Sequence, residues 1–120
     1  MNNKQFEGLI NASPEKRYRS FLNTVADREE IWFVMSDEGI LMTEIDEIEY
    51  ILVWPRKEFC SFMLLDEGER AIAMEIHEFI AKCNDVGDLH FMVFPTEKDT
   101  YIVHKDELIE DILEYLQEVE

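Results

Sequence analysis

Two apolar runs in this chain end in the same way, with an aromatic residue followed by proline. They are YILVWP at residues 50–55 and HFMVFP at residues 90–95. Proline has no backbone N–H, so it cannot extend the ladder of a central strand. Each run is therefore predicted to be a short strand that stops at its aromatic residue. The apolar residues of 56–63 are spaced as on a helix, so Trp54–Pro55 is predicted to be a strand-to-helix corner.

Apolar residues recur at helical spacing in three other segments. Ser13 and Pro14 suit the N-cap and first position of a helix predicted at 13–27. A second helix is expected at 75–83. A third is expected to begin near Asp106 and to bury one apolar stripe. That stripe comprises Leu108, Ile109, Ile112, Leu113, Leu116 and Val119.

The remaining apolar segments are rich in β-branched and aromatic residues, which favour strands. Strands are predicted at 31–35, 40–43, 48–54, 89–94 and 101–104, with a short extended piece at 71–74. The turn at 95–100 indicates an antiparallel hairpin. The expected fold class is α+β, an antiparallel sheet of about four strands packed with amphipathic helices. The 120 residues fit one domain at 13–120, after an N-terminal arm or short helix at 1–12.

The balance of charge limits the classes of partner. The chain has 28 acidic and 11 basic residues, for a net charge of −17. Such a surface repels phosphate backbones and anionic lipids, so neither nucleic acid nor a membrane is an expected partner. A basic protein partner fits the charge, and so does a role of the acidity in solubility alone. The sequence shows neither a secretion signal nor a membrane span, which predicts a cytoplasmic protein.

No residue pattern of a known catalytic or metal-binding motif is present. The histidines, His77, His90 and His104, form no HxH or HExxH motif, although the last two are candidates for cross-strand neighbours. Cys60 and Cys83 are too far apart in sequence for a CxxC motif and are predicted to be buried thiols. We therefore expect no metal, no cofactor and no catalytic residue.

The charged clusters have a plain interpretation and a sharper alternative. The acidic residues of 44–49 are predicted to form an exposed, solvated loop or the tip of a hairpin, with calcium binding as the alternative. Lys16, Arg17 and Arg19 surround Tyr18 and are expected to neutralise nearby acids; a small anion site is the alternative.

Two sets of residues are candidates for binding. If one face of the sheet is open, its aromatic residues and the arginine at the helix start would form a groove for a small ligand or peptide. These residues are Trp32, Trp54, Arg56 and Phe94. The last helix is expected to present an acidic face, either as an ordinary solvated surface or as a docking strip for a basic partner. This face comprises Glu107, Glu110, Asp111, Glu114 and Glu118.

Four segments together resemble a known family. They are RYRSFLNTVADREEIW at 17–32, LVWPRKEF at 52–59, EIHEFI at 75–80 and MVFPTEKDTYIV at 92–103. In order and spacing they are similar to the bacterial family catalogued as domain of unknown function 2750. The resemblance covers most of the chain and implies a compact bacterial domain, and it brings no activity or site residues. Sequences of this kind often carry additional aromatic residues where this chain has none, at 64–73.

The functional expectation follows from these exclusions. The leading hypothesis is a small acidic, non-catalytic bacterial domain that binds a protein partner, with an immunity or inhibitor role against a basic toxin as a specific version. The alternative is a domain that binds a small ligand or peptide on an aromatic sheet face. An enzyme is the weakest of the three hypotheses, because no catalytic pattern supports it.

Overall fold

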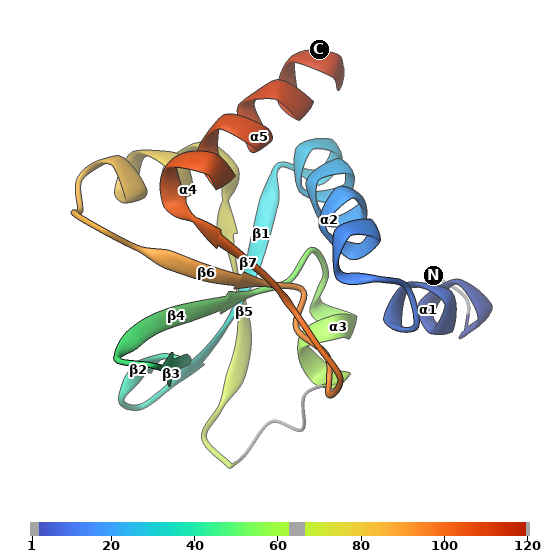
Figure 1. Cartoon of the computed structure of the whole chain (residues 1–120), viewed down its shortest axis with the longest axis horizontal. Coiled ribbons are helices and arrows are strands. Elements are labelled where there is room, and N and C mark those ends of the chain that lie inside the picture. Colours follow the sequence, from blue (N-terminus) through green and yellow to red (C-terminus); the bar gives the residue numbers. More distant parts are fainter. Residues whose placement is uncertain (1–2, 63–66, 120) are drawn as a thin grey trace.

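The computed structural model describes residues 3–62 and 67–119, which form five helices and seven strands (Figure 1). The helices are α1 (Asn3–Ile10), α2 (Pro14–Arg28), α3 (Lys57–Phe62), α4 (Ile76–Asn84) and α5 (Lys105–Val119). The strands are β1 (Glu30–Ser36), β2 (Gly39–Ile40), β3 (Met42–Ile45), β4 (Ile48–Val53), β5 (Arg70–Glu75), β6 (His90–Val93) and β7 (Tyr101–His104). The predicted α+β class is confirmed, and the arm at 1–12 contains a helix.

The strands form two sheets, where the sequence had predicted one. Their orders are β2-β1-β5 and β3-β4-β6-β7. Trp32 and Trp54 join the two sheets through a pair of backbone hydrogen bonds, each with an N–O distance of 2.9 Å. The neighbours β4 and β6 are parallel, whereas every other strand pair is antiparallel within the described residues. This parallel pair corrects the expected antiparallel sheet, because the connection between β4 and β6 crosses over through α3, β5 and α4.

The parallel pair explains why two strands end alike. Val53 of β4 lies opposite Val93 of β6, so the two aromatic–proline corners leave the sheet side by side. The backbone N–H of Phe94 donates to the carbonyl of Val53 at 2.8 Å, and the indole N–H of Trp54 donates to the carbonyl of Pro95 at 3.4 Å. The two corners therefore form one structural unit that closes this end of the core.

The local predictions for α2 are confirmed. The side chain of Ser13 accepts a hydrogen bond from the backbone N–H of Lys16 at 3.2 Å, and Pro14 occupies the first turn. The helix ends at Glu29, whose φ of 55° is left-handed. Such a residue ends a helix by turning its backbone away from the helical path.

The segment at 40–43 is divided between two strands rather than one. Leu41 lies between β2 and β3, and its backbone N–H donates to Val34 of β1 at 2.8 Å. The chain thus leaves the sheet of β1 and enters that of β4. Asp46 and Glu47 then form the tip of the β3–β4 hairpin with φ of 52° and 68°, so the hairpin tip predicted as one of two forms for this acidic segment is confirmed.

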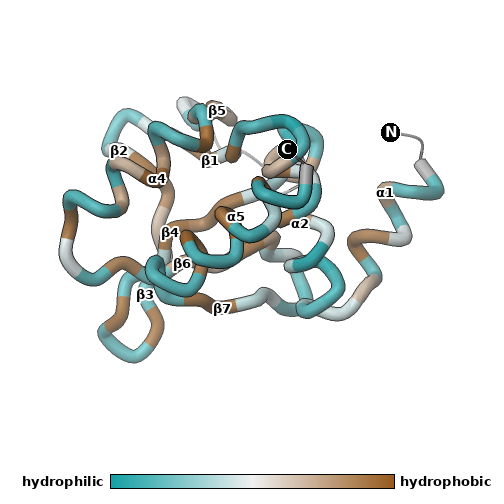
Figure 2. The backbone as a smooth tube through the Cα atoms, turned by 90° about the horizontal axis from the view of Figure 1, so that it is seen from above, coloured by the Kyte–Doolittle hydropathy of each residue, from teal (hydrophilic) through white to brown (hydrophobic). Residues whose placement is uncertain are grey.

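The helices cover one face of the four-stranded sheet. In Figure 1, α2, α4 and α5 lie on the upper side of β4, β6 and β7. Figure 2 shows the strands as largely hydrophobic beneath the more hydrophilic turns of α2 and α5. Phe91 is buried against Phe79 of α4, with ring centres 5.5 Å apart, and the buried Val103 lies opposite Phe91 on the same face. Leu113 departs from the predicted stripe of α5, since 43% of its surface is exposed.

Candidate functional site

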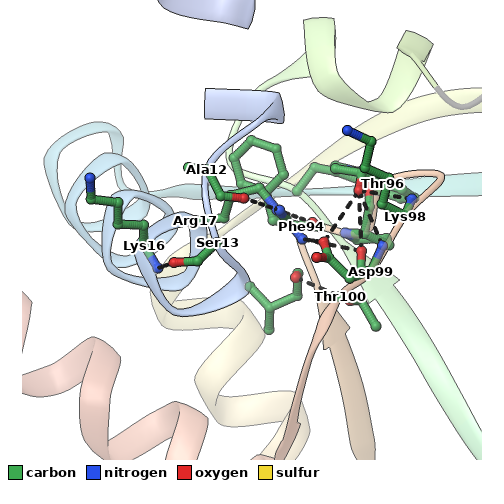
Figure 3. Close-up of polar contacts among 12 residues, drawn as sticks. Ala12, Ser13, Lys16, Arg17, Phe94, Thr96, Lys98, Asp99 and Thr100 are labelled. Carbon is green, nitrogen blue, oxygen red and sulfur yellow. Dashed lines mark hydrogen bonds and ion pairs between the residues drawn. The ribbon is translucent and has the colours of Figure 1, made fainter. Parts of the chain in front are cut away.

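Arg17 is buried beside the two aromatic–proline corners, with only 1% of its surface exposed. Its Nε donates to the carbonyl of Phe94 at 3.1 Å, and its terminal nitrogens donate to the carbonyls of Ala12 at 2.6 Å and Asp99 at 3.1 Å. It also forms an ion pair with the carboxylate of Asp99 (Figure 3). Because these acceptors all belong to the chain, Arg17 serves to join α2 to the turn at 95–100, and the alternative of an anion site at this guanidinium is wrong.

Two of the predicted ligand-binding residues belong to the core. Trp54 is fully buried, and Phe94 packs against Phe59 with ring centres 4.5 Å apart. Neither ring is accessible to a ligand in solvent. The predicted aromatic groove therefore does not form from these residues, because the parallel pairing of β4 and β6 turns both corners into the interior.

The other two predicted ligand-binding residues lie nearer the surface. Trp32 is half-buried, and its indole N–H donates to Glu30 at 3.1 Å. Arg56 lines an open hollow of ≈ 330 Å³. The hollow is further lined by Asn23, Thr24, Asp27 and Arg28. An arginine of α2 and an arginine of the corner after β4 thus line one polar space.

The acidic face of α5 is exposed as predicted, with one exception. Asp111 is half-buried, and its carboxylate accepts a hydrogen bond of 2.6 Å from the hydroxyl of Tyr18. Burial, followed by this hydrogen bond, raises the pKa of Tyr18 far above its ordinary value. Asp111 thus connects α5 to α2 rather than facing a partner.

The other four carboxylates of the predicted face are exposed, and an exposed apolar side chain borders them. They are Glu107, Glu110, Glu114 and Glu118, and Leu113 stands at the edge of their face, one helical turn after Glu110. We call these five residues the acidic strip. Leu113 escaped the sequence analysis because it stands four positions after the buried Ile109, a spacing that also fits the buried stripe.

The histidine pair predicted for the last hairpin is present. His90 lies opposite His104 across β6 and β7, with ring centres 5.1 Å apart. The Nε2 of His104 lies 3.1 Å from a carboxylate oxygen of Asp88, and its Nδ1 accepts the backbone N–H of Asp106 at 3.2 Å. Within residues 3–62 and 67–119 no cluster of three or more His, Cys, Asp or Glu residues is arranged to hold a metal ion.

Both cysteines are buried free thiols, as predicted. Burial raises the pKa of Cys60 to about 12 and that of Cys83 to about 11. The carbonyl of Cys83 accepts a hydrogen bond of 2.8 Å from the ammonium of Lys105, and the carbonyl of Val86 accepts another at 2.6 Å. Lys105 therefore caps the C-terminal end of α4, where a positive charge is favoured by the helix dipole.

The fold and its surface define the chain as an acidic α+β domain with a charged helix face and an interior closed by aromatic–proline corners. Of the helices that the structure describes, none has both the length and the apolar composition to cross a membrane. The chain belongs to the family of proteins of unknown function designated DUF2750, whose family model matches residues 18–112. A search of curated proteins finds no match to this chain.

Proposed function

We propose that this chain is a non-catalytic bacterial domain, located in the cytoplasm, that binds a basic protein partner. The observation that carries the proposal is the acidic strip of α5, in which four exposed carboxylates share one helix face and the exposed Leu113 stands at its edge. An immunity or inhibitor role against a basic toxin is a specific form of this function.

The acidic strip combines two properties that protein interfaces use. Carboxylates on one helix face attract a basic surface and orient it, which raises the association rate and the specificity. An apolar side chain within the contact supplies burial that charge alone does not provide. With 43% of its surface exposed, Leu113 offers such a contact at the edge of the strip. The net charge of −17 strengthens the attraction at low ionic strength.

The experiment is a capture assay with three forms of the full chain. The first is wild type and the second is Glu110→Gln/Glu114→Gln/Glu118→Gln. The third is Asp37→Asn/Glu38→Gln/Glu67→Gln, which removes the same charge from a different acidic surface. Each is immobilised at low salt in an extract, and bound proteins are released by increasing salt and identified.

Wild type and the control are expected to retain one basic protein that the α5 variant loses. The purified partner should then bind wild type at least about tenfold more tightly than the α5 variant, because three charges near the interface are removed. Equal loss in both variants would show that only net charge matters. Equal binding by all three forms would reject the acidic strip as the contact.

A second function has one specific observation in its favour. Arg28 and Arg56 both line the polar hollow of ≈ 330 Å³. Their guanidinium groups form ion pairs with Glu30 at 3.5 Å and Glu58 at 3.4 Å through Nε, and the terminal nitrogens of two such groups are suited to bind a carboxylate or phosphate. Under this alternative the chain binds a small anionic ligand. Inorganic phosphate should then raise the melting temperature of wild type and leave that of Arg28→Gln/Arg56→Gln unchanged. Equal shifts for the two proteins would reject the site.

A further inference from the structure

The second face of the four-stranded sheet carries apolar side chains that its helices do not use. Side chains alternate between the faces of a strand, and directly paired residues share a face. The register places Leu52, Met92 and Ile102 in one row and Ile45 opposite Ile48 in another, on the face away from Phe91 and Val103. Tyr50 lies between the two rows, in a row with Thr43, His90 and His104. We call these six residues the outer face: Ile45, Ile48, Tyr50, Leu52, Met92 and Ile102.

The outer face has a buried floor and exposed sides. Tyr50, Leu52 and Met92 on the two central strands are buried. On the flanks, 44% of the surface of Ile45 and 50% of that of Ile102 are exposed. An open hollow of ≈ 290 Å³ adjoins the floor at Leu52 and Met92, and its walls come from β3 and from the turn at 95–100. The face is therefore a shallow groove between two aliphatic ridges, largely apolar and crossed at its middle row by Tyr50 and the histidine pair.

The rim of the groove is acidic. Its carboxylates are Asp46 and Glu47 at the hairpin tip, Glu97 and Asp99 beside the hollow, and Asp88 and Asp106 at His104. Asp99 is paired with Arg17, and Lys98 is the cation among the residues that line the hollow. The rim thus retains a clear excess of negative charge.

We propose that the outer face binds an amphipathic helix of a partner protein, with the apolar stripe of that helix in the groove and flanking Lys or Arg residues against the rim. This sheet has α2, α4 and α5 on one face. The other face of an antiparallel sheet in an α+β domain is commonly polar and solvated, whereas here it exposes the aliphatic side chains of Ile45, Ile48 and Ile102. A partner helix would supply the second layer, as in other helix-in-groove contacts. The acidic rim selects a basic helix and opposes a second copy of this chain, whose net charge is −17.

The inference rests on the proposed function in one respect, namely that the partner is a basic protein. It adds a second contact surface, on the side of the sheet opposite α5. The probe for its test is a synthetic peptide of leucine and lysine arranged with helical periodicity. A peptide of the same composition in strict alternation, which favours strands, is the comparison. Binding is followed by amide and methyl chemical shifts of the labelled full chain.

The helical peptide is expected to shift the resonances of Ile45, Ile48, Leu52, Met92 and Ile102. The variant Ile45→Thr/Ile48→Thr/Ile102→Thr should bind it about tenfold more weakly, since apolar contact is lost on both ridges. Threonine suits these exposed strand positions, and Ile102→Thr alone provides a milder variant. Ile40→Thr, at an exposed isoleucine on β2 of the other sheet, should leave this affinity within about twofold of wild type.

Four results would overturn the inference. Shifts confined to α5, with unchanged binding by the triple variant, would reject the outer face and leave the proposed function standing. Absence of binding by the helical peptide would reject a basic helix as the ligand. Tighter binding of the alternating peptide at the outer face would show that this face binds an extended strand rather than a helix. If wild type forms a dimer and the triple variant does not, the outer face binds a second copy of this chain and not a partner helix.

Discussion

Arg17 and Phe94 are 77 positions apart in sequence and share a hydrogen bond of 3.1 Å between the guanidinium Nε and the carbonyl oxygen. The Cζ of Arg17 also lies 5.9 Å from the centre of the Phe94 ring. Phe94 has a φ of 53°, a left-handed conformation that is unfavourable for a bulky side chain. The guanidinium thus stabilises a strained residue at the end of β6 and connects it to α2.

The first prediction concerns this buried guanidinium. Arg17→Lys retains the charge and loses the planar fork that reaches three carbonyl groups, so several acceptors lose their donors. The free energy of unfolding is expected to fall by about 3 kcal/mol, measured by urea denaturation. Arg19→Lys is the matched control, because Arg19 is exposed on the same helix, and it should change stability by less than about 0.5 kcal/mol. Equal effects of the two substitutions would refute the role of Arg17.

The second prediction concerns the tip of the β3–β4 hairpin. Asp46 and Glu47 both have positive φ, which a type I′ turn requires and which Asp-Gly adopts most readily. Glu47→Gly is therefore expected to stabilise the protein by about 0.5–1 kcal/mol, seen as a higher urea midpoint. Glu38→Gly is the control, since Glu38 does not have positive φ, and it should be neutral or destabilising. A lower midpoint for Glu47→Gly would contradict the turn geometry.

The third prediction concerns the two thiols. Burial raises the pKa of Cys60 to about 12 and that of Cys83 to about 11, so both are protonated and unreactive at pH 8. Iodoacetamide should modify neither cysteine in the native protein and both after unfolding in guanidinium, as measured by mass spectrometry. Rapid modification of the native protein at either position would show that the thiol is accessible.

The fourth prediction concerns Glu75, the N-cap of α4. Hydrogen bonds from the backbone N–H and then the ring of His77 lower the pKa of Glu75 below its ordinary value of 4.5. A lowered folded-state pKa contributes stability that is complete above the unfolded-state value and is lost as pH falls through the folded-state value. The urea midpoint of Glu75→Gln should therefore decrease less than that of wild type as pH falls below about 4.5. Parallel decreases in the two proteins would exclude this contribution.

Local chemistry in the sequence determined where the helices and strands begin and end, and much of the charged surface. The cap at Ser13, the stop at each aromatic–proline pair and the cross-strand histidines follow from neighbouring residues, and the structure bears them out. The acidic face of α5 also follows from helical spacing, except at Asp111, whose hydroxyl partner Tyr18 lies 93 positions away.

Only the tertiary structure decided how these elements meet. The sequence does not show that β4 and β6 are parallel neighbours, because strand pairing depends on the crossover between them and leaves no mark on either strand. That pairing buries Trp54 and Phe94 and brings Arg17 to the turn at 95–100. It also leaves an apolar face of the sheet open. Periodicity identifies which side chains are apolar, and long-range packing determines which of them remain accessible.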